Sequence, residues 1–427
     1  MKIAQVAPLI ESVPPRLYGG TERIVSYLTE ELVRLGHDVT LFASGDSVSS
    51  AALAPCCTRA LRLDPAMPDV LPHSMLMIDN VRERAEEFDV LHFHIDLFHF
   101  PLFRSLASRT LTTLHGRQDL GDLGTFYSRF SEMPLVSISD DQRKPLPQAK
   151  FMTTIHHGIP ADLHRPSFEK GEYFAFLGRI SPEKRPDRAI RIARAAGIPL
   201  KIAAKVDKVD EDYFRSEILP LIDGPGVEFI GEINEREKTK FLGDANALLF
   251  PVDWPEPFGL VMIEAMACGT PVLAFRCGSI PEVIEDGVTG KVVDSEQEAV
   301  AVLPELLSYD RRAVRRRFDE RFTAMRMAED YVSTYHQLLR MRTCTGQRRS
   351  TALRRRGLNG GNGSIPVSIE RPLPALAQAD ANCEVDPISM RAVDLSMTLP
   401  RRDPETIGAD ENVICVSAVG PEMPGIK

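Results

Sequence analysis

Two hydrophobic patterns alternate along the first half of the chain. Lys2–Ala7 is a short apolar run, Gly19-Gly20-Thr21 interrupts the pattern, and Glu22–Leu35 then carries apolar residues at helical spacing up to Gly36. His37–Ala43 is again a short apolar run. A strand, a helix and a second strand in this order are typical of a parallel sheet with crossover helices. The opening of the chain therefore predicts an α/β fold.

The same pattern continues and later restarts, which predicts two domains. In the first half, further strands are predicted at 90–93, 111–114, 135–138 and 151–155, with a helix around 74–87. After a polar, irregular segment at 161–171, strands are predicted at 173–177, 200–204, 227–230, 247–250 and 271–275, interleaved with helices near 211–221, 235–242 and 258–268. We expect an N-terminal domain at 1–165, a hinge, and a C-terminal domain at 171–340, each with a doubly wound sheet.

The pattern stops after Arg340. Residues 341–427 hold a basic run, a Gly/Asn-rich segment at 357–363, and scattered Pro, Ser and acidic residues. This composition predicts a disordered, low-complexity tail. The basic run could meet anionic lipid headgroups, but a solvated linker is the favoured interpretation.

The composition of the chain argues against some classes of function. The chain has 427 residues, 43% of them hydrophobic, which is enough for two packed cores. Its net charge of −9 argues against a general nucleic-acid binder. The seven cysteines show no paired metal-ligand spacing, and no apolar run is long enough for a signal peptide or a membrane span. We expect a cytoplasmic protein, with peripheral contact at the inner face of the membrane left open.

The segment from Pro255 to Pro271 holds the main candidate chemistry. Phe258–Cys268 has the length of a buried helix, so the carboxylate of Glu264 needs a hydrogen-bonding partner there. Glu256 precedes the helix between two prolines, and the N–H groups of Phe258, Gly259 and Leu260 would form an anion site at the helix N-terminus. The alternative is a core helix whose buried glutamate pairs with an arginine.

Other candidates lie at the ends of predicted strands. Arg179 and Lys184 flank a turn after the 173–177 strand and offer two complementary ways to bind a diphosphate, although a solvated charged turn is the alternative. His115 follows the 111–114 strand, at the edge where ligands of parallel sheets bind. Gly19 and Gly20 would let backbone approach a sugar or phosphate, and a tight turn explains them equally well.

From these residues the chain resembles the family 4 glycosyltransferases, which are retaining enzymes that use nucleotide-sugar donors. The family signature is Glu, seven residues, Glu and then Gly-Thr-Pro-Val, matched here by Glu256, Glu264 and 269–272. The resemblance covers roughly residues 1–340. It implies that Glu264 holds the donor ribose, that Glu256 lies beside the transferred sugar, and that the backbone at 258–260 holds sugar and phosphate.

The resemblance also implies roles for the remaining candidates. Arg179 and Lys184 would bind the donor diphosphate, and His115 would contact the donor sugar. The chain departs from the family pattern at His157 and Pro160, at Arg185, where Gly is common, and at Ala204-Lys205. These departures put the local contacts at the domain boundary and at the donor base in doubt.

The resemblance thus implies the glycosyltransferase B fold, with two Rossmann-like domains facing across a cleft. The expected reaction moves a sugar from a nucleotide diphosphate sugar to a hydroxyl acceptor, which would be a sugar, a lipid-linked glycan or a small molecule. The anomeric configuration would be retained, and no cofactor or metal would be required. Two alternatives remain open: an epimerase or phosphorylase of the same fold, and a non-catalytic protein that binds sugar nucleotides.

Overall fold

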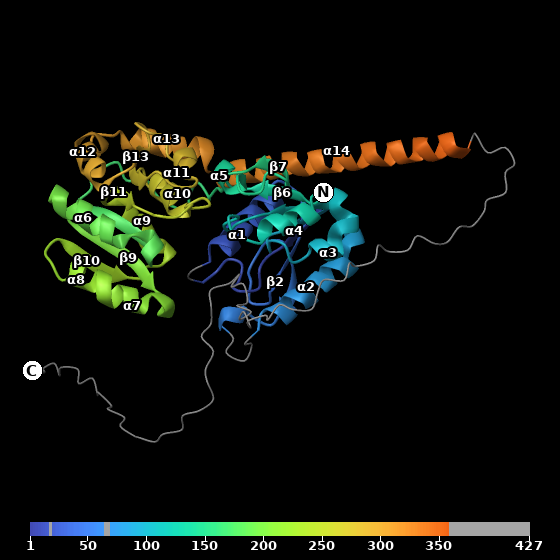
Figure 1. The fold of residues 1–427 in the computed structure, drawn as a ribbon, viewed down its shortest axis with the longest axis horizontal. Helices are drawn as coiled ribbons and strands as arrows, with labels where there is room; N and C mark the ends of the chain where they lie inside the picture. Colours follow the sequence, from blue (N-terminus) through green and yellow to red (C-terminus); the bar gives the residue numbers. More distant parts are fainter. Residues whose placement is uncertain (17–18, 64–68, 358–427) are drawn as a thin grey trace, which may run out of the picture. The chain divides into compact units, whose positions relative to one another are not determined.

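The computed structural model describes residues 1–16, 19–63 and 69–357, and these form two parallel sheets (Figure 1). The first sheet has the strand order β3-β2-β1-β4-β5-β6-β7. Its strands are β1 Lys2–Val6, β2 Asp38–Ser44, β3 Ala52–Cys57, β4 Val90–Phe93, β5 Thr110–Thr113, β6 Pro134–Ser137 and β7 Lys150–Thr154, paired in parallel throughout.

Helices cover both faces of the first sheet. Because side chains alternate along a strand, Ile3 of β1 faces one helical layer while Ala4 faces the other. The layer on the Ile3 face comes from α1 Gly20–Arg34 and α14 Ala324–Gly357, and the opposite layer comes mainly from α2 Leu71–Glu83, α3 Phe100–Phe103 and α4 Leu123–Arg129. A short helix, α5 Asp140–Arg143, follows β6.

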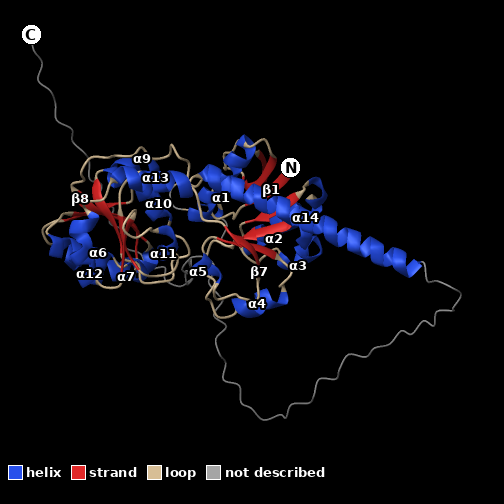
Figure 2. Cartoon of the chain, turned by 90° about the horizontal axis from the view of Figure 1, so that it is seen from above, coloured by secondary structure: helices blue, strands red, loops and turns tan. Residues whose placement is uncertain are grey.

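The second sheet has the order β10-β9-β8-β11-β12-β13. Its strands are β8 Tyr173–Ile180, β9 Leu200–Val206, β10 Val227–Gly231, β11 Ala245–Phe250, β12 Val272–Phe275 and β13 Gly290–Val293, all paired in parallel. Figure 2 shows these strands between two helical layers. One layer holds α9 Glu235–Gly243, α10 Leu260–Ala267 and α13 Arg311–Arg321, and the other holds α6 Pro186–Ala196 and α12 Glu296–Leu306.

The predicted fold class is confirmed by these two α/β units. Some elements were not predicted, and one predicted helix differs in detail. The sequence gives no expectation for β3 or β13, which are both strands of the sheets. The predicted helix near 211–221 is divided into α7 Glu211–Tyr213, a π-helical turn Phe214–Ile218 and α8 Leu219–Ile222. A further short helix, α11 Ile280–Val283, follows β12.

Helix α14 joins the end of the described chain to the first sheet. Tyr331, Tyr335 and Leu338 are buried in the same cluster as Ile3. By packing, the start of α14 therefore belongs with the first sheet, although it falls inside the predicted range 171–340, and the predicted domain boundaries stay predictions. The predicted tail begins as helix, because α14 continues to Gly357. Residues 358–427 lie outside the described residues.

Candidate functional site

Helix α10 begins at a left-handed glycine. Gly259 has a φ of +82°, and a Cβ there would lie 2.7 Å from Cε of Met262. A residue with a Cβ atom is strained at such a positive φ, whereas glycine is not. The expected helix start at Phe258 is therefore wrong by two residues: the helix begins at Leu260, and Phe258 packs in the core before it. The N–H of Met262 donates to the carbonyl of Gly259 at 3.1 Å, and the N–H groups of Leu260 and Val261 precede this first bond, so the N-terminus still favours an anion.

Glu256 and Lys184 meet in front of α10. The Glu256 Oε2 atom accepts hydrogen bonds from Lys184 Nζ at 2.5 Å and from Trp254 Nε1 at 2.8 Å. Lys184 Nζ also lies 4.6 Å from the centre of the Trp254 ring, at cation–π distance. The two loops are joined by a backbone bond from Asp253 N to Glu183 O at 2.8 Å. Residues 72 positions apart thus form one charged cluster.

Arg179 lies at the end of β8, before the turn Pro182–Lys184. Its guanidinium donates to Glu183 at 2.9 Å and to Asp207 at 3.4 Å. Arg179 and Lys184 therefore extend from the two sides of one turn, as their spacing predicts. In this structure both cations are paired with carboxylates, and a bound diphosphate would exchange some of these contacts for its own oxygens.

Glu264 lies inside α10 and is 2% exposed. Its Oε1 atom accepts from Lys238 Nζ at 3.0 Å and from Arg23 Nη1 at 3.4 Å. Burial alone would raise the pKa of this carboxyl, but Lys238, Arg23 and His164 outweigh burial and hold the pKa below its usual value. The alternative of a glutamate paired with an arginine is thus partly realised. The Oε2 atom is buried without a hydrogen-bond partner among the described residues, so one oxygen remains for a ligand.

Gly19 and Gly20 mark the start of α1. A Cβ on Gly20 would lie 3.8 Å from Cδ1 of Leu260, and one on Gly19 would lie 2.8 Å from Cβ of Pro15. The structure therefore brings the glycine pair to the first residue of α10. Because Gly19 packs closely against Pro15, a glycine at this position also has a purely structural explanation.

His115 follows β5 and is half-buried. Its Nε2 atom lies 2.9 Å from Nδ1 of His94, and its ring stacks on His157 with 5.2 Å between ring centres. The His157 ring in turn meets the Phe258 ring edge-on at 5.0 Å. Burial lowers the pKa of His115 to about 3, so the ring is neutral at physiological pH. His115 is thereby connected to the segment that leads into α10.

One group of side chains has the composition of a metal site. Ligand atoms of His164, Glu235 and Glu264 lie within 4.8 Å of one another. The same two carboxylates also contact Arg23 and Lys238, so their negative charge is already compensated. A divalent cation would have to bind beside these two positive groups. The prediction that no metal is required stays a prediction.

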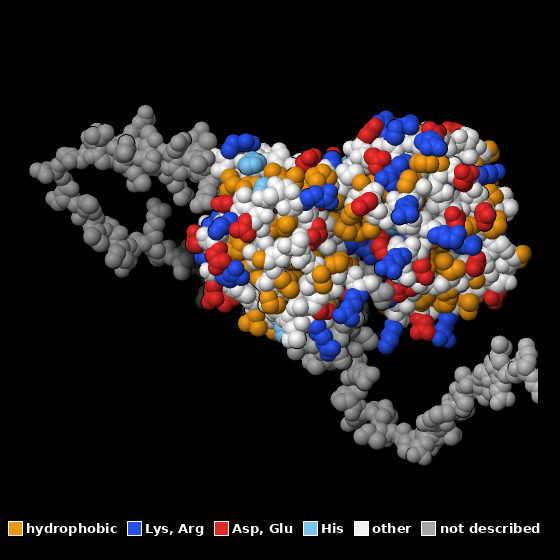
Figure 3. Space-filling view, turned by 180° about the vertical axis from the view of Figure 1, so that it is seen from behind, with side chains coloured by type: hydrophobic (Ala, Val, Ile, Leu, Met, Phe, Trp, Pro, Cys, Tyr) orange, Lys and Arg blue, Asp and Glu red, His pale blue; other side chains and the backbone are white. Residues whose placement is uncertain are grey.

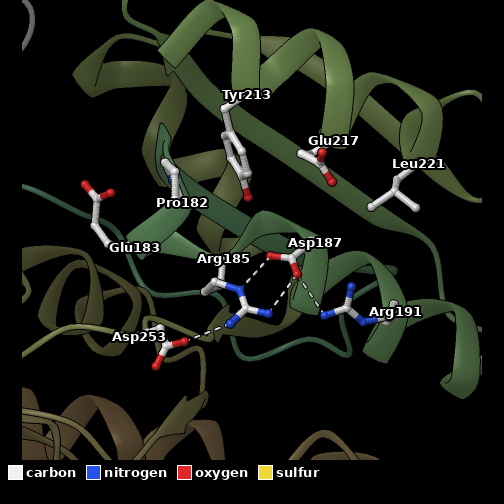
Figure 4. Close-up of a pocket in the computed structure, with 9 residues that line it drawn as sticks. All are labelled: Pro182, Glu183, Arg185, Asp187, Arg191, Tyr213, Glu217, Leu221 and Asp253. Atoms are coloured by element: carbon white, nitrogen blue, oxygen red, sulfur yellow. Dashed lines mark hydrogen bonds and ion pairs between the residues drawn. The ribbon is translucent and has the colours of Figure 1, made fainter. Parts of the chain in front are cut away.

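A hollow of about 620 Å³ lies beside the turn that carries Lys184 (Figure 4). It is lined by Arg185, Asp187 and Asp253 among others, and it does not include Glu256 or Glu264. Arg185 has a left-handed φ of +52°, which explains why glycine is common at this position in the family pattern. Its guanidinium bonds both oxygens of Asp187 at 2.9 Å and Asp253 at 2.8 Å. Arg185 thus ties the Lys184 turn to the loop before Glu256.

The charged side chains on one face of the described residues are mixed in sign. On the face shown in Figure 3, Lys and Arg side chains are interspersed with Asp and Glu rather than gathered in a basic patch. This distribution fits the net charge of −9. Among the described residues, every helix is too short or too polar to cross a membrane.

Comparison with known proteins identifies the family. The model "Glycosyltransferase Family 4" matches residues 18–188, and the model "Glycosyl transferases group 1" matches residues 163–323. The chain belongs to the group 1 glycosyltransferases. The second match contains Lys184, Glu256 and Glu264, so the charged cluster and α10 lie inside the region that defines the family.

Sequence relatives of this family member are distant. The D-inositol 3-phosphate glycosyltransferase of Mycolicibacterium paratuberculosis is 30% identical over 154 residues, which cover 33% of this chain and 35% of that protein. An uncharacterized glycosyltransferase of Methanocaldococcus jannaschii is 25% identical over 337 residues, covering 68% and 84%. The match thus spans about a third of the length of the first relative.

Solved structures share the fold of the glycosyltransferase. AviGT4, involved in avilamycin A biosynthesis, is 24% identical with a TM-score of 0.60, covering 79% of this chain and 98% of its own. Sucrose-phosphate synthase from Thermosynechococcus elongatus is 19% identical with a TM-score of 0.63, covering 80% and 100%. HepE from Anabaena, solved with UDP and glucose, is 18% identical with a TM-score of 0.60, covering 79% and 100%. At these identities the likeness concerns the fold alone.

Sequence reasoning did not find several partners of the predicted residues. Trp254, which donates to Glu256, lies inside the same proline-rich loop and could have been suspected from its position. Arg23 and Lys238 are remote from Glu264 in the sequence, and no local pattern predicts that they meet it. Gln5 is an isolated polar residue in an apolar strand, and such a position indicates a buried side chain that needs hydrogen-bond partners.

Proposed function

We propose that the chain transfers a sugar from a nucleoside diphosphate sugar to a hydroxyl acceptor with retention of configuration. The observation that carries this proposal is the arrangement around α10. The Lys184–Glu256 pair stands in front of the helix N-terminus, and the unpartnered oxygen of Glu264 lies one turn inside it. Glu264 lies four positions after Leu260 in the helix, a rise of roughly 6 Å. A donor diphosphate at the N-terminus would thus have an acceptor for its ribose hydroxyls nearby.

Each residue then has a role that its environment suits. The cations Arg179 and Lys184 and the first N–H groups of α10 would stabilise the charge that develops on the leaving diphosphate. Glu264 Oε2 would accept from the ribose diol, and Glu256 would bind the transferred sugar. His115, linked to Phe258 through His157, would contact the same sugar.

Retention of the anomeric configuration is what the family resemblance implies, and it needs a site chemistry different from that of the hydrolases. Retaining hydrolases place two carboxylates on opposite sides of the anomeric carbon. Glu264 is buried in α10 and would face the ribose, which would leave Glu256 as the carboxylate beside the sugar. We infer that leaving-group stabilisation, rather than a pair of carboxylates, supplies most of the catalysis. Neither a metal nor a further cofactor has a role in this scheme, and the solved complex of HepE with UDP and glucose is consistent with a donor of this class.

The test is a nucleotide-release assay on the full chain. Uridine, guanosine and adenosine diphosphate sugars are each incubated with the enzyme, with and without a pool of sugar, glycolipid and small-molecule acceptors. We expect one donor class to release nucleoside diphosphate in an acceptor-dependent way, with the new glycosidic bond in the donor configuration by proton NMR. Isomerisation of the donor would indicate an epimerase, dependence on inorganic phosphate would indicate a phosphorylase, and binding without release would indicate a non-catalytic protein.

A further inference from the structure

A row of buried polar side chains lies beneath His115 on one face of the first sheet. Gln5 comes from β1, His92 from β4 and His94 from the residue after β4, and all three are at most 3% exposed. Buried polar groups are retained only where hydrogen bonds satisfy them. The roles proposed above use neither Gln5 nor His94.

The hydrogen bonds of this row have a direction. Gln5 Nε2 donates to the hydroxyl of Tyr335 at 3.1 Å, which leaves Gln5 Oε1 facing His94 Nε2 at 2.8 Å. An amide oxygen only accepts, so His94 must carry its proton on Nε2. A neutral imidazole has one N–H, and the Nδ1 atom of His94 is therefore an acceptor. Its partner at 2.9 Å, His115 Nε2, must donate.

Both rings are neutral, which the direction of the row requires. Burial holds the pKa of His94 well below its usual value, and the neighbouring rings of His92, His115 and His157 lower it further. Burial likewise lowers the pKa of His115. With one proton on each ring, His115 is protonated at Nε2 and its Nδ1 bears a lone pair. That Nδ1 atom is buried and has no hydrogen-bond partner among the described residues.

We propose that Gln5 and His94 are positioning residues that hold His115 in its Nε2–H tautomer, so that Nδ1 accepts a hydrogen bond from a substrate hydroxyl. The identity of that hydroxyl compound as a sugar rests on the proposed function, whereas the tautomer does not. The stack from His115 through His157 to Phe258 places this acceptor by the segment that enters α10. A ring with such a low pKa orients a hydroxyl and does not remove its proton at neutral pH.

The arrangement also selects the substrate group. The lone pair on Nδ1 accepts a hydrogen bond from an O–H group. A deoxy or O-methyl analogue has no such proton at that position and leaves Nδ1 without a partner. Loss of one neutral hydrogen bond corresponds to roughly a tenfold fall in kcat/KM. Gln5 and His94 would thus determine specificity without touching the substrate.

The first experiment needs no substrate. Long-range proton–nitrogen NMR of the full chain, labelled with ¹⁵N-histidine and assigned with His115→Gln, reports which ring nitrogen of His115 carries the proton. We expect Nε2–H in the wild type and in His94→Asn, whose amide oxygen can still accept. We expect a mixture of tautomers in His94→Leu. A wild-type His115 protonated at Nδ1, or charged at pH 7, would overturn the proposal.

The second experiment tests the substrate hydroxyl with UDP-glucose and its monodeoxy analogues. For the wild type and His94→Asn, we expect one analogue to lose about tenfold in kcat/KM. In His94→Leu that difference should shrink to near unity, whereas a merely structural role would slow all substrates alike. Equal loss for every analogue in every variant would refute the specificity role. If no sugar nucleotide turns over at all, the proposed function fails, and the NMR result still decides the tautomer.

Discussion

At the scale of single residues, the pairing of Lys184 with Glu256 decides how the site can respond to a ligand. Their side chains are 17% and 11% exposed. Removing one partner of such a pair leaves the other charge poorly solvated, so the loss exceeds that of a surface ion pair. In the proposed function, a diphosphate would add negative charge next to Lys184 and relieve its dependence on Glu256, which would free Glu256 to bind the sugar.

The two cations should therefore be needed for donor affinity. Arg179→Ala and Lys184→Ala each remove a charge-assisted contact worth roughly 1.5–3 kcal/mol, or about 10- to 150-fold in Kd. Lys240→Ala, at an exposed lysine on α9, is the matched control and should bind donor normally. Isothermal titration with the nucleoside diphosphate measures all three. Unchanged affinity in both site variants would remove the diphosphate site from this account.

The sequence predicts those site residues that belong to a local pattern. Glu256, Glu264, Arg179 and Lys184 follow from the family motif and from turn and helix signals. The partners that set their charge do not, because Arg23 reaches Glu264 across 241 positions and belongs to another sheet's helix. Such contacts depend on tertiary packing, which short-range periodicity does not encode.

At the scale of elements, the start of α10 depends on one backbone conformation. Gly259→Ala should destabilise the fold by about 1–2 kcal/mol, the cost of a left-handed L-residue, and displace the amides that we propose bind the donor phosphate. Gly124→Ala in α4 is the matched control. A Cβ there meets only Gln148 Nε2 at 3.7 Å, so alanine should be neutral or stabilising by up to about 1 kcal/mol. Urea unfolding compares them, and equal stability of the two variants would contradict the strain.

Helix α1 carries a glutamate that should make stability depend on pH. Burial raises the pKa of Glu22 to about 7, with Glu11 adding to the effect. The folded state then holds the proton more tightly than the unfolded state, so stability falls as pH rises from about 4.5 to 7 and the penalty is constant above that. The penalty is at most roughly 3 kcal/mol.

Replacing the Glu22 carboxyl tests whether its ionisation destabilises the folded state. Glu22→Gln should be more stable than the wild type at pH 8, and the difference should vanish near pH 4. Thermal unfolding across this pH range measures it, with the exposed Glu83→Gln as a control for loss of a charge. A variant that is less stable than the wild type at pH 8 would show that the Glu22 carboxylate is stabilised by its surroundings.

Two of the elements that the sequence did not predict, β3 and β13, are edge strands, and helices α6, α12 and α13 were not predicted either. β3 and β13 each end a sheet, β3 contains Pro55, and β13 is only four residues long. Proline is tolerated at edges because the outer N–H needs no partner, and it weakens the strand pattern. The central strands were predicted because both of their faces are buried, which makes them continuous apolar runs.

At the scale of the whole molecule, we expect the buried start of α14 to be needed for folding and the residues after Arg340 to be dispensable. Truncation after Arg340 keeps Tyr331, Tyr335 and Leu338 in their cluster and should leave melting temperature and activity unchanged. Truncation after Glu329 removes these three buried side chains, each worth about 1.5–3 kcal/mol, and should abolish soluble expression. Scanning calorimetry measures the stability of both truncated proteins, and the nucleotide-release assay measures their activity. Loss of folding in the longer protein would make residues after 340 structural.

The central claim is that the two glutamates around α10 serve different parts of one donor. Steady-state kinetics with donor varied at saturating acceptor tests it most directly. Glu264→Gln loses the charged acceptor for the ribose, so KM for the donor should rise with a smaller change in kcat. Glu256→Gln loses an interaction that strengthens as the glycosidic bond breaks, so kcat should fall with little change in KM. A Glu256→Gln enzyme with normal kcat would contradict the account.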